Sequence, residues 1–281
     1  MQQPTPPETA ARAETATRAE QADDLGFPVR TGEIRRVVSL VPSLTEAVAA
    51  TAPHLLVGAT AWCTEPADLD VVRIGGTKNP DLPAILALAP DLVLANEEEN
   101  RAVDLDALRA AGIAVWATRI RTLDQALLSL ERMLVHGCRL PAPAWLEQAR
   151  SAWTATSGVA TTSGVATGRP PRAVVPIWRR PWMVLGRDTF AGDLLRQLGV
   201  EQIYADHRDR YPAIELDQLN ATAPDLVVLP DEPYRFTAAD GPEAFPGLPA
   251  ALVSGRHLTW YGPSLVQAPA LLAHQLRHPL T

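Results

Sequence analysis

The sequence lacks most of the features that membrane, metal-binding and nucleic-acid-binding proteins need. It has only two cysteines in 281 residues, Cys63 and Cys138, and neither these nor the six histidines stand at the spacing of a metal site. We expect the two thiols to be free and buried, with a disulfide between them as the alternative. A formal net charge of −7 argues against a phosphate-binding surface, which needs clustered lysine and arginine. No apolar run reaches the roughly 18 residues of a transmembrane helix.

The first 31 residues lack the apolar run of a secretory signal. They mix Pro, Thr, Glu, Gln, Asp and Arg with Ala, whereas such a signal needs about 7–15 consecutive apolar residues. We therefore expect a disordered tail at residues 1–31 and a cytoplasmic chain.

Catalytic motifs are also missing. The chain has no GxSxG elbow, no GxxxxGK[ST] loop and no GxGxxG motif after a strand. Gly75-Gly76-Thr77-Lys78 is only superficially similar to a phosphate loop, because the first glycine is not at the required distance. We expect a protein that is not an enzyme, with no catalytic residues, no cofactor and no metal bound directly by its side chains.

Short apolar runs alternate with helical patterns along the chain. The runs at 35–41, 55–60, 92–95 and 113–117 read as strands, and helix patterns stand between them. This alternation predicts the α/β class with a parallel sheet that is covered on both faces.

The second half of the sequence repeats features of the first. Ala89–Val93 reads APDLV and recurs at Ala223–Val227, and the strand that begins at Arg36 has a counterpart at Arg172. In both matches the second copy follows the first after nearly the same number of residues, which predicts two similar lobes.

We place the two lobes at residues 32–121 and 171–281, the second ending in a helix near 263–277. Residues 122–155 have helical spacing and should bridge the lobes. The tandem repeat TSGVAT, which completes the connecting segment 122–170, reads as a flexible insertion.

Loops at the carboxyl ends of parallel strands supply the candidate ligand-binding residues, because open α/β sheets bind ligands there. In the first lobe these are Ser43, Thr77, Asn79, Asn96 and Glu97; in the second they are Trp178, Arg179, Trp182, Tyr211, Asp231, Tyr234 and Trp260.

Aromatic residues are scarce in this chain. The aromatic candidates of the second lobe nevertheless all fall in or beside predicted loops. For any one of them taken alone packing is the favoured interpretation, but as a group they predict a cleft wall for a flat or bulky ligand. The acidic run Glu97–Glu99 is either a solvated loop or a contact with a ligand or partner. Arg179 and Arg180 either hold an anionic group or lie on the surface.

Four segments of the chain carry a resemblance to a known family. These are RRVVSLVPSLTE, RIGGTKNPDLPAILALAPDLVLANEEEN, GRDTFAGDLLRQLGVEQIY and LNATAPDLVVLPDEPY. Over Ile34 to Leu276 the chain resembles the helical-backbone substrate-binding proteins of metal-chelate ABC importers, which bind cobalamin, haem or ferric siderophores. The resemblance implies two Rossmann-like lobes joined by one long rigid helix, with the ligand between them.

The sequence is most similar to the cobalamin-binding branch of this family. Members of that branch carry tryptophan at the positions that align with Thr77, Asn96 and Tyr211, so aromatic character is kept only at the third. The resemblance also implies docking on an ABC permease through one acid on each lobe, for which Asp81 and Asp217 are the candidates.

Three functional hypotheses follow from the sequence. The first is a monomeric binding protein for a metal chelate, a corrinoid such as cobalamin, with haem or a ferric siderophore as the alternative ligand and no nucleic-acid partner. The second is a cytoplasmic corrinoid or haem carrier or sensor that has no transporter. The third, an enzyme on the same scaffold, is disfavoured because no nucleophile and base are paired.

Overall fold

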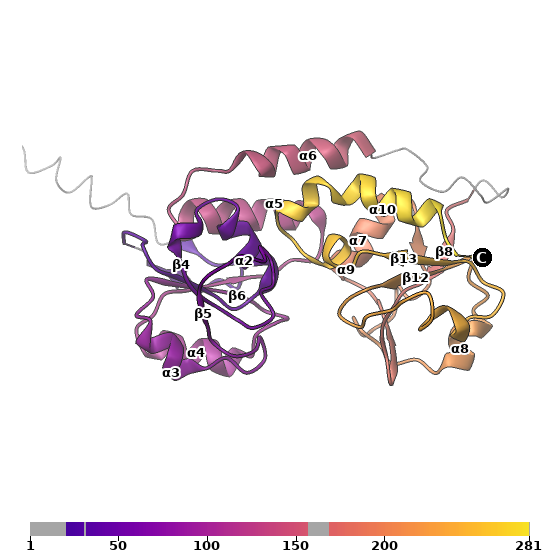
Figure 1. Cartoon of the computed structure of the whole chain (residues 1–281), viewed down its shortest axis with the longest axis horizontal. Helices are drawn as coiled ribbons and strands as arrows, with labels where there is room; N and C mark the ends of the chain where they lie inside the picture. Colours follow the sequence, from indigo (N-terminus) through magenta and orange to yellow (C-terminus); the bar gives the residue numbers. More distant parts are fainter. Residues whose placement is uncertain (1–20, 31, 157–168, 281) are drawn as a thin grey trace, which may run out of the picture.

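The computed structural model describes residues 21–30, 32–156 and 169–280, and it divides them into two α/β lobes (Figure 1). Each lobe has its own parallel sheet, and no strand of the described residues joins the two sheets. The predicted fold class is confirmed. Within these ranges no helix is both long and apolar enough to cross a membrane. The predictions for residues 1–20 and for the repeat at 157–168 lie outside the described residues.

The first lobe is built on a five-stranded parallel sheet in the order β5-β4-β3-β6-β7. Its strands are β3 (Val37–Ser39), β4 (Leu56–Ala59), β5 (Val72–Arg73), β6 (Leu92–Asn96) and β7 (Val115–Thr118). Its helices are α2 (Pro42–Ala49), the 3₁₀ turn η1 (Pro53–Leu55), α3 (Leu82–Ala87) and α4 (Ala102–Ala110). Every residue of β6 is buried, as its continuous apolar sequence predicts for a strand that is covered on both faces.

The second lobe has a four-stranded parallel sheet in the order β11-β8-β12-β13. Its strands are β8 (Arg172–Val174), β11 (Glu201–Gln202), β12 (Leu226–Pro230) and β13 (Ala250–Val253), and a separate hairpin pairs β9 (Pro176–Arg179) with β10 (Trp182–Val184). Its helical elements are α7 (Phe190–Gln197), α8 (Leu216–Ala221), η3 (Pro242–Ala244), α9 (Gly255–Thr259), η4 (Pro263–Val266) and α10 (Ala268–Arg277).

The repeated APDLV motif has the same structural role in both lobes. The backbone N–H of Asp91 donates to the carbonyl of Arg36 at 2.9 Å, and its carboxylate accepts the N–H of Arg36 at 2.8 Å. Asp225 makes the equivalent two bonds with Arg172, both of 2.8 Å. In each lobe the aspartate thus joins the start of the first sheet strand to the start of a neighbouring strand.

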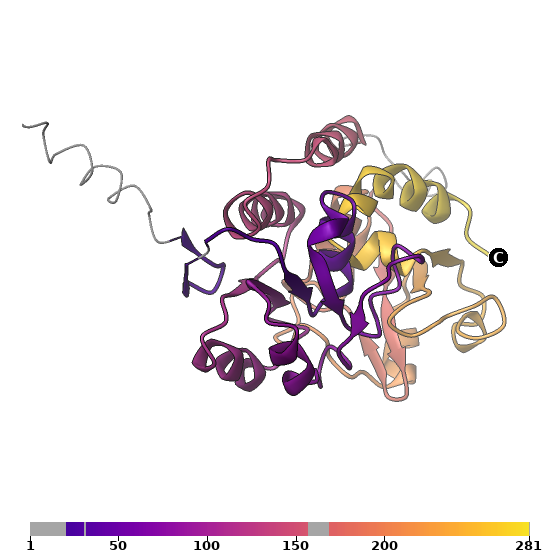
Figure 2. The same cartoon turned by 60° about the vertical axis from the view of Figure 1, so that its left-hand side comes forward.

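Two helices, rather than the single long helix implied by the family resemblance, connect the lobes. Helix α5 (Leu123–Arg132) continues into a π-helical turn, η2 (Met133–Gly137), and α6 (Ala144–Thr156) follows. Pro141 and Pro143 lie between them, and proline cannot donate the backbone hydrogen bond that would continue a helix. The two helices pack against each other, and Figure 2 shows them nearly end-on.

Helix α6 contacts both lobes. The indole N–H of Trp145 donates to the hydroxyl of Thr51 in the first lobe at 3.1 Å, and that of Trp153 donates to the carbonyl of Leu265 in the second lobe at 3.0 Å. The second helix of the connection therefore links the two lobes directly.

Residues 21–30 are ordered, so the prediction of a disordered tail is wrong for this part. They form a small hairpin of β1 (Gln21–Ala22) and β2 (Pro28–Val29). Asp24 pairs with Arg132 of α5 at 2.5 Å and accepts the backbone N–H of Arg119 at 3.0 Å. Composition gave no sign of this, because the partners of the hairpin lie about a hundred residues further along the chain.

Candidate functional site

The lobes meet where the loop that follows β6 faces the second lobe. Glu98 of this loop accepts a hydrogen bond from the hydroxyl of Tyr211 at 2.7 Å and forms an ion pair with the neighbouring Arg210. Arg121, at the start of the connection between the lobes, pairs with the same carboxylate. Glu98 is thus held by the second lobe and the connection together.

The acidic run beside Glu98 is engaged rather than solvated. Glu97 pairs with both Arg119 and Arg121. Burial favours a higher pKa for Glu97, but the two guanidinium groups outweigh it and lower the pKa. Burial raises the pKa of Glu99, and the positive charge of Lys78 offsets only part of that effect. The pKa values of Glu97 and Glu99 are therefore shifted in opposite directions, although both carboxyl groups lie near arginine or lysine side chains.

A second inter-lobe contact lies at helix α2. The buried carboxylate of Glu46 pairs with Arg256 of α9, and the backbone of Ser43 lies against Gly262 of the second lobe. Burial raises the pKa of Glu46, and Arg256 opposes that rise. Ser43, a predicted ligand contact, is itself buried in this interface.

The first-lobe candidates for hydrogen bonds to a ligand differ in how far their polar groups are already used. The side-chain amide of Asn96 is buried; it donates to Thr118, and its oxygen accepts the N–H of Glu98 at 2.8 Å. Its polar groups are used within the lobe, so it shapes the loop rather than facing a ligand. Asn79 is exposed, and Thr77 offers its carbonyl to Asn100 at 2.9 Å.

Most of the second-lobe aromatic candidates pack within their own lobe. Trp182 stacks on Phe236 with ring centroids 6.0 Å apart, and the hydroxyl of Tyr234 donates to Asp240 at 2.7 Å. Trp260 is buried. Trp178, in contrast, leaves 42% of its surface exposed while its ring edge meets Tyr234. Only part of the predicted aromatic wall is therefore open to a ligand.

Two polar candidates of the second lobe are also used internally. Arg179 pairs with Asp240 and Glu243 of its own lobe through its two terminal nitrogens, so its charge is already balanced within the lobe. Asp231 accepts the N–H of Gly255 at 2.6 Å and so fixes the start of α9. Both have nearby partners that the sequence does not reveal.

The structure adds three residues that the sequence did not single out. Trp62 follows β4 and is 67% exposed, the largest value among the bulky apolar side chains of the described residues. Arg121 and Arg210 meet at Glu98, although they are far apart in sequence. The position of Arg210 directly before Tyr211 was the one available signal.

The two candidate docking acids are both exposed. Asp81 caps helix α3, accepting the N–H of Ala84 at 3.0 Å, and Asp217 lies in the first turn of α8. Figure 1 places α3 and α8 at the same end of their two lobes, opposite helix α6. No contact tests their role, so permease docking stays a prediction.

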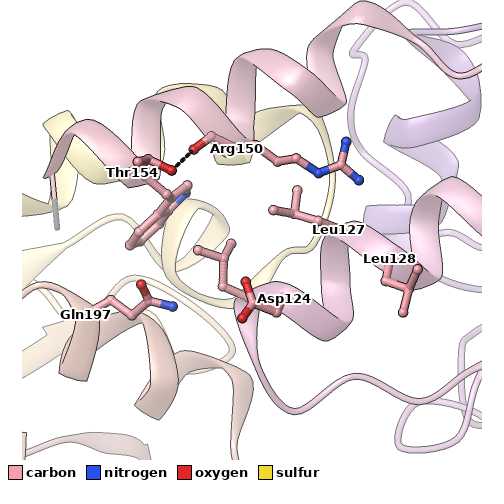
Figure 3. A pocket seen from close by; sticks show the side chains of 8 residues that line it. Asp124, Leu127, Leu128, Arg150, Thr154 and Gln197 are labelled. Atoms are coloured by element: carbon pink, nitrogen blue, oxygen red, sulfur yellow. Dashed lines mark hydrogen bonds between the residues drawn. The ribbon is translucent and has the colours of Figure 1, made fainter.

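The described residues contain no group of three or more His, Cys, Asp or Glu side chains that could hold a metal ion. A hollow of about 440 Å³ lies instead between helices α5, α6 and α7, on the side of the connection (Figure 3). Asp124, Arg150 and Gln197 line it, and none of the predicted ligand contacts does.

Two lobes with parallel sheets, bridged by helices and facing each other across charged loops, define the fold class of a substrate-binding protein. No protein-family model matches the chain. It is 27% identical over 207 residues to the vitamin B12-binding protein of Yersinia pestis (strain Pestoides F), a match that covers 73% of this chain and 72% of that protein.

Solved structures extend this similarity. The periplasmic heme-binding protein BhuT in complex with two hemes is 25% identical, with a TM-score of 0.71 over 86% of this chain and 97% of that one. The periplasmic vitamin B12 binding protein BtuF of Vibrio cholerae shares the fold at 19% identity, with a TM-score of 0.64 over 86% and 96%. These similarities confirm the resemblance to the metal-chelate substrate-binding family of ABC importers. The relatives are named as binding proteins rather than enzymes, in agreement with the prediction.

Proposed function

We propose that the chain is a binding protein of the ABC-importer type that holds a metal chelate, in the first place a corrinoid such as cobalamin, between its lobes. The observation that carries this proposal is the contact of Tyr211 with the loop after β6. It brings the aromatic candidate of the second lobe to the carboxyl end of the first-lobe sheet, where α/β sheets bind ligands.

Exposed aromatic surface supports a large, flat ligand. Trp62 and Trp178 are the two tryptophans that remain exposed among the described residues, and each lobe contributes one. Covering about 100 Å² of such surface is worth roughly 2.5 kcal/mol at 25 cal/mol per Å². Because Thr77 and Asn96 stand where the cobalamin branch has tryptophan, we expect weaker binding than in a dedicated scavenger.

Haem is a second candidate, and Tyr211 is the observation that favours it. A tyrosine oxygen is one of the axial ligands that proteins offer to haem iron. Burial first, and then the charge of Glu98, raise the pKa of Tyr211, so the phenol stays protonated while it donates to Glu98. Ligation of haem iron would require the phenol of Tyr211 to lose this proton. Binding of a corrinoid would not require that loss.

Titration calorimetry with cobalamin, cobinamide and haemin separates these candidates. We expect Trp178→Ala to weaken corrinoid binding about tenfold, while Leu128→Ala, which removes an exposed side chain on α5, leaves it unchanged. Tyr211→Phe should change the haem absorption spectrum only if the phenol ligates iron. If none of these ligands binds at high micromolar concentration, the proposal is wrong. The location of the chain stays a prediction, which fractionation of native cells tests.

A further inference from the structure

Two guanidinium groups and one hydroxyl converge on one carboxylate at the meeting point of the lobes, and the contact of Arg210 is an ion pair without a hydrogen bond. Arg121 and Arg210 both pair with Oε1 of Glu98, and the hydroxyl of Tyr211 donates to Oε2 at 2.7 Å. The side chains of Arg121, Glu98 and Arg210 are 21%, 23% and 24% exposed. Water therefore screens the cluster only partly, and charge-assisted hydrogen bonds are strong under these conditions.

From this arrangement we propose that Arg121, Arg210 and Tyr211 form a subsite for an anionic group of the ligand, a carboxylate or phosphate, and that Glu98 competes with that group from within the protein. The inference rests on the proposed function, because it names the part of a chelate that this region would bind. The carboxylate of Glu98 accepts hydrogen bonds from Arg121 and Tyr211 and forms an ion pair with Arg210, whose buried Nη2 has no hydrogen-bond partner. These positions suit a ligand carboxylate or the oxygens of a phosphate, which could also accept the hydrogen bond that Arg210 does not make here.

The surroundings allow Glu98 to leave. Arg121 also pairs with Glu97, so it keeps one anionic partner. Lys78 lies at the backbone carbonyl of Glu98 and offers the released carboxylate another cation. For Arg210, Glu98 is the only carboxylate within ion-pair distance among the described residues, so an incoming anion would replace what Arg210 loses.

The test compares matched probes on Glu98→Gln, which keeps the shape of the side chain and removes its charge. The probes are haemin against haemin dimethyl ester, and cobyrinic acid against its heptamethyl ester, each pair differing in free carboxylates. We expect Glu98→Gln to bind the free acids at least tenfold more tightly than wild type and the esters within about twofold. Arg210→Gln should weaken binding of the acids alone. Glu131→Gln, which breaks a surface pair with Arg150, is the matched control.

Inorganic phosphate separates this proposal from the proposed function. Phosphate should raise the melting temperature of Glu98→Gln more than that of wild type, and adding Arg210→Gln should abolish the difference. If phosphate has this effect while no chelate binds, the subsite stands and the proposed function fails. The subsite proposal is overturned if chelates bind but Glu98→Gln changes neither the ratio of the affinities for free acid and ester nor the rise in melting temperature with phosphate. Circular dichroism confirms that each variant is folded.

Discussion

The ion pair between Glu46 and Arg256 should respond unequally to loss of its two members. The side chain of Glu46, in α2 of the first lobe, is 8% exposed, whereas that of Arg256, on α9 of the second lobe, is 32% exposed. Arg256→Met leaves a buried carboxylate without its partner, which costs about 3 kcal/mol at neutral pH, the low end for breaking a buried pair. Glu46→Gln leaves a guanidinium that still reaches water, so we expect a loss below about 1 kcal/mol.

The pH dependence follows from the raised pKa of Glu46, which burial causes and which Arg256 partly opposes. For an acid whose pKa is higher in the folded than in the unfolded state, the cost of burying the charge is fully present above the folded pKa. That cost is relieved as pH falls through the folded pKa. Removing Arg256 should raise this pKa further, so the deficit of Arg256→Met should shrink between pH 7 and pH 5.

Urea unfolding at pH 7 and pH 5 measures both effects, with tryptophan fluorescence as one probe because Trp260 lies against Arg256. Circular dichroism is the second probe, and Arg35→Met, which breaks an exposed pair with Glu33, is the control. Equal losses in Glu46→Gln and Arg256→Met at pH 7, or a deficit that does not change at pH 5, would refute the reasoning.

Two further predictions concern the repeated motif and a buried thiol. Asp225→Asn should lower the unfolding free energy by about 1–2 kcal/mol, and Asp91→Asn by a similar amount, because each removes a charged acceptor for the first strand of its lobe. Burial favours a higher pKa for Asp225, but the N–H of Arg172 and the guanidinium of Arg169 lower it, so acid titrations should show this stability present above pH 3.8 and lost below it. Burial raises the pKa of Cys138 to about 12, so a disulfide reagent at pH 8 should leave it unmodified until urea unfolds the chain; reaction in the folded protein would contradict this burial.

Periodicity and repetition predicted the lobes because both are local properties of the chain. The apolar runs became buried strands, and the second APDLV segment took the position that the first implied. The single long helix implied by the family resemblance is wrong for this chain, because the break at Pro141 and Pro143, visible in the sequence, separates α5 from α6. Both free cysteines are buried, as expected.

The candidate site was harder to predict because it depends on distant partners. Asn96 and Arg179 were chosen for their position after strands, but each finds a partner within its own lobe. Conversely, Arg121 and Arg210 become candidates only because the structure shows that both pair with Glu98. Sequence position placed the candidate residues in the loops at the ends of strands, whereas the direction and pairing of each side chain required the three-dimensional structure.

The hairpin at residues 21–30 limits where the chain can be trimmed. Asp23 pairs with Arg109 of α4 at 3.3 Å, and Asp24 reaches Arg132 of α5. A protease or an expression vector that begins the chain at the first sheet strand would expose those arginines and uncover Val29, which is buried in the first-lobe core. A fragment that keeps these contacts must therefore include residues 21–30, which lie well before the parallel sheet of the first lobe.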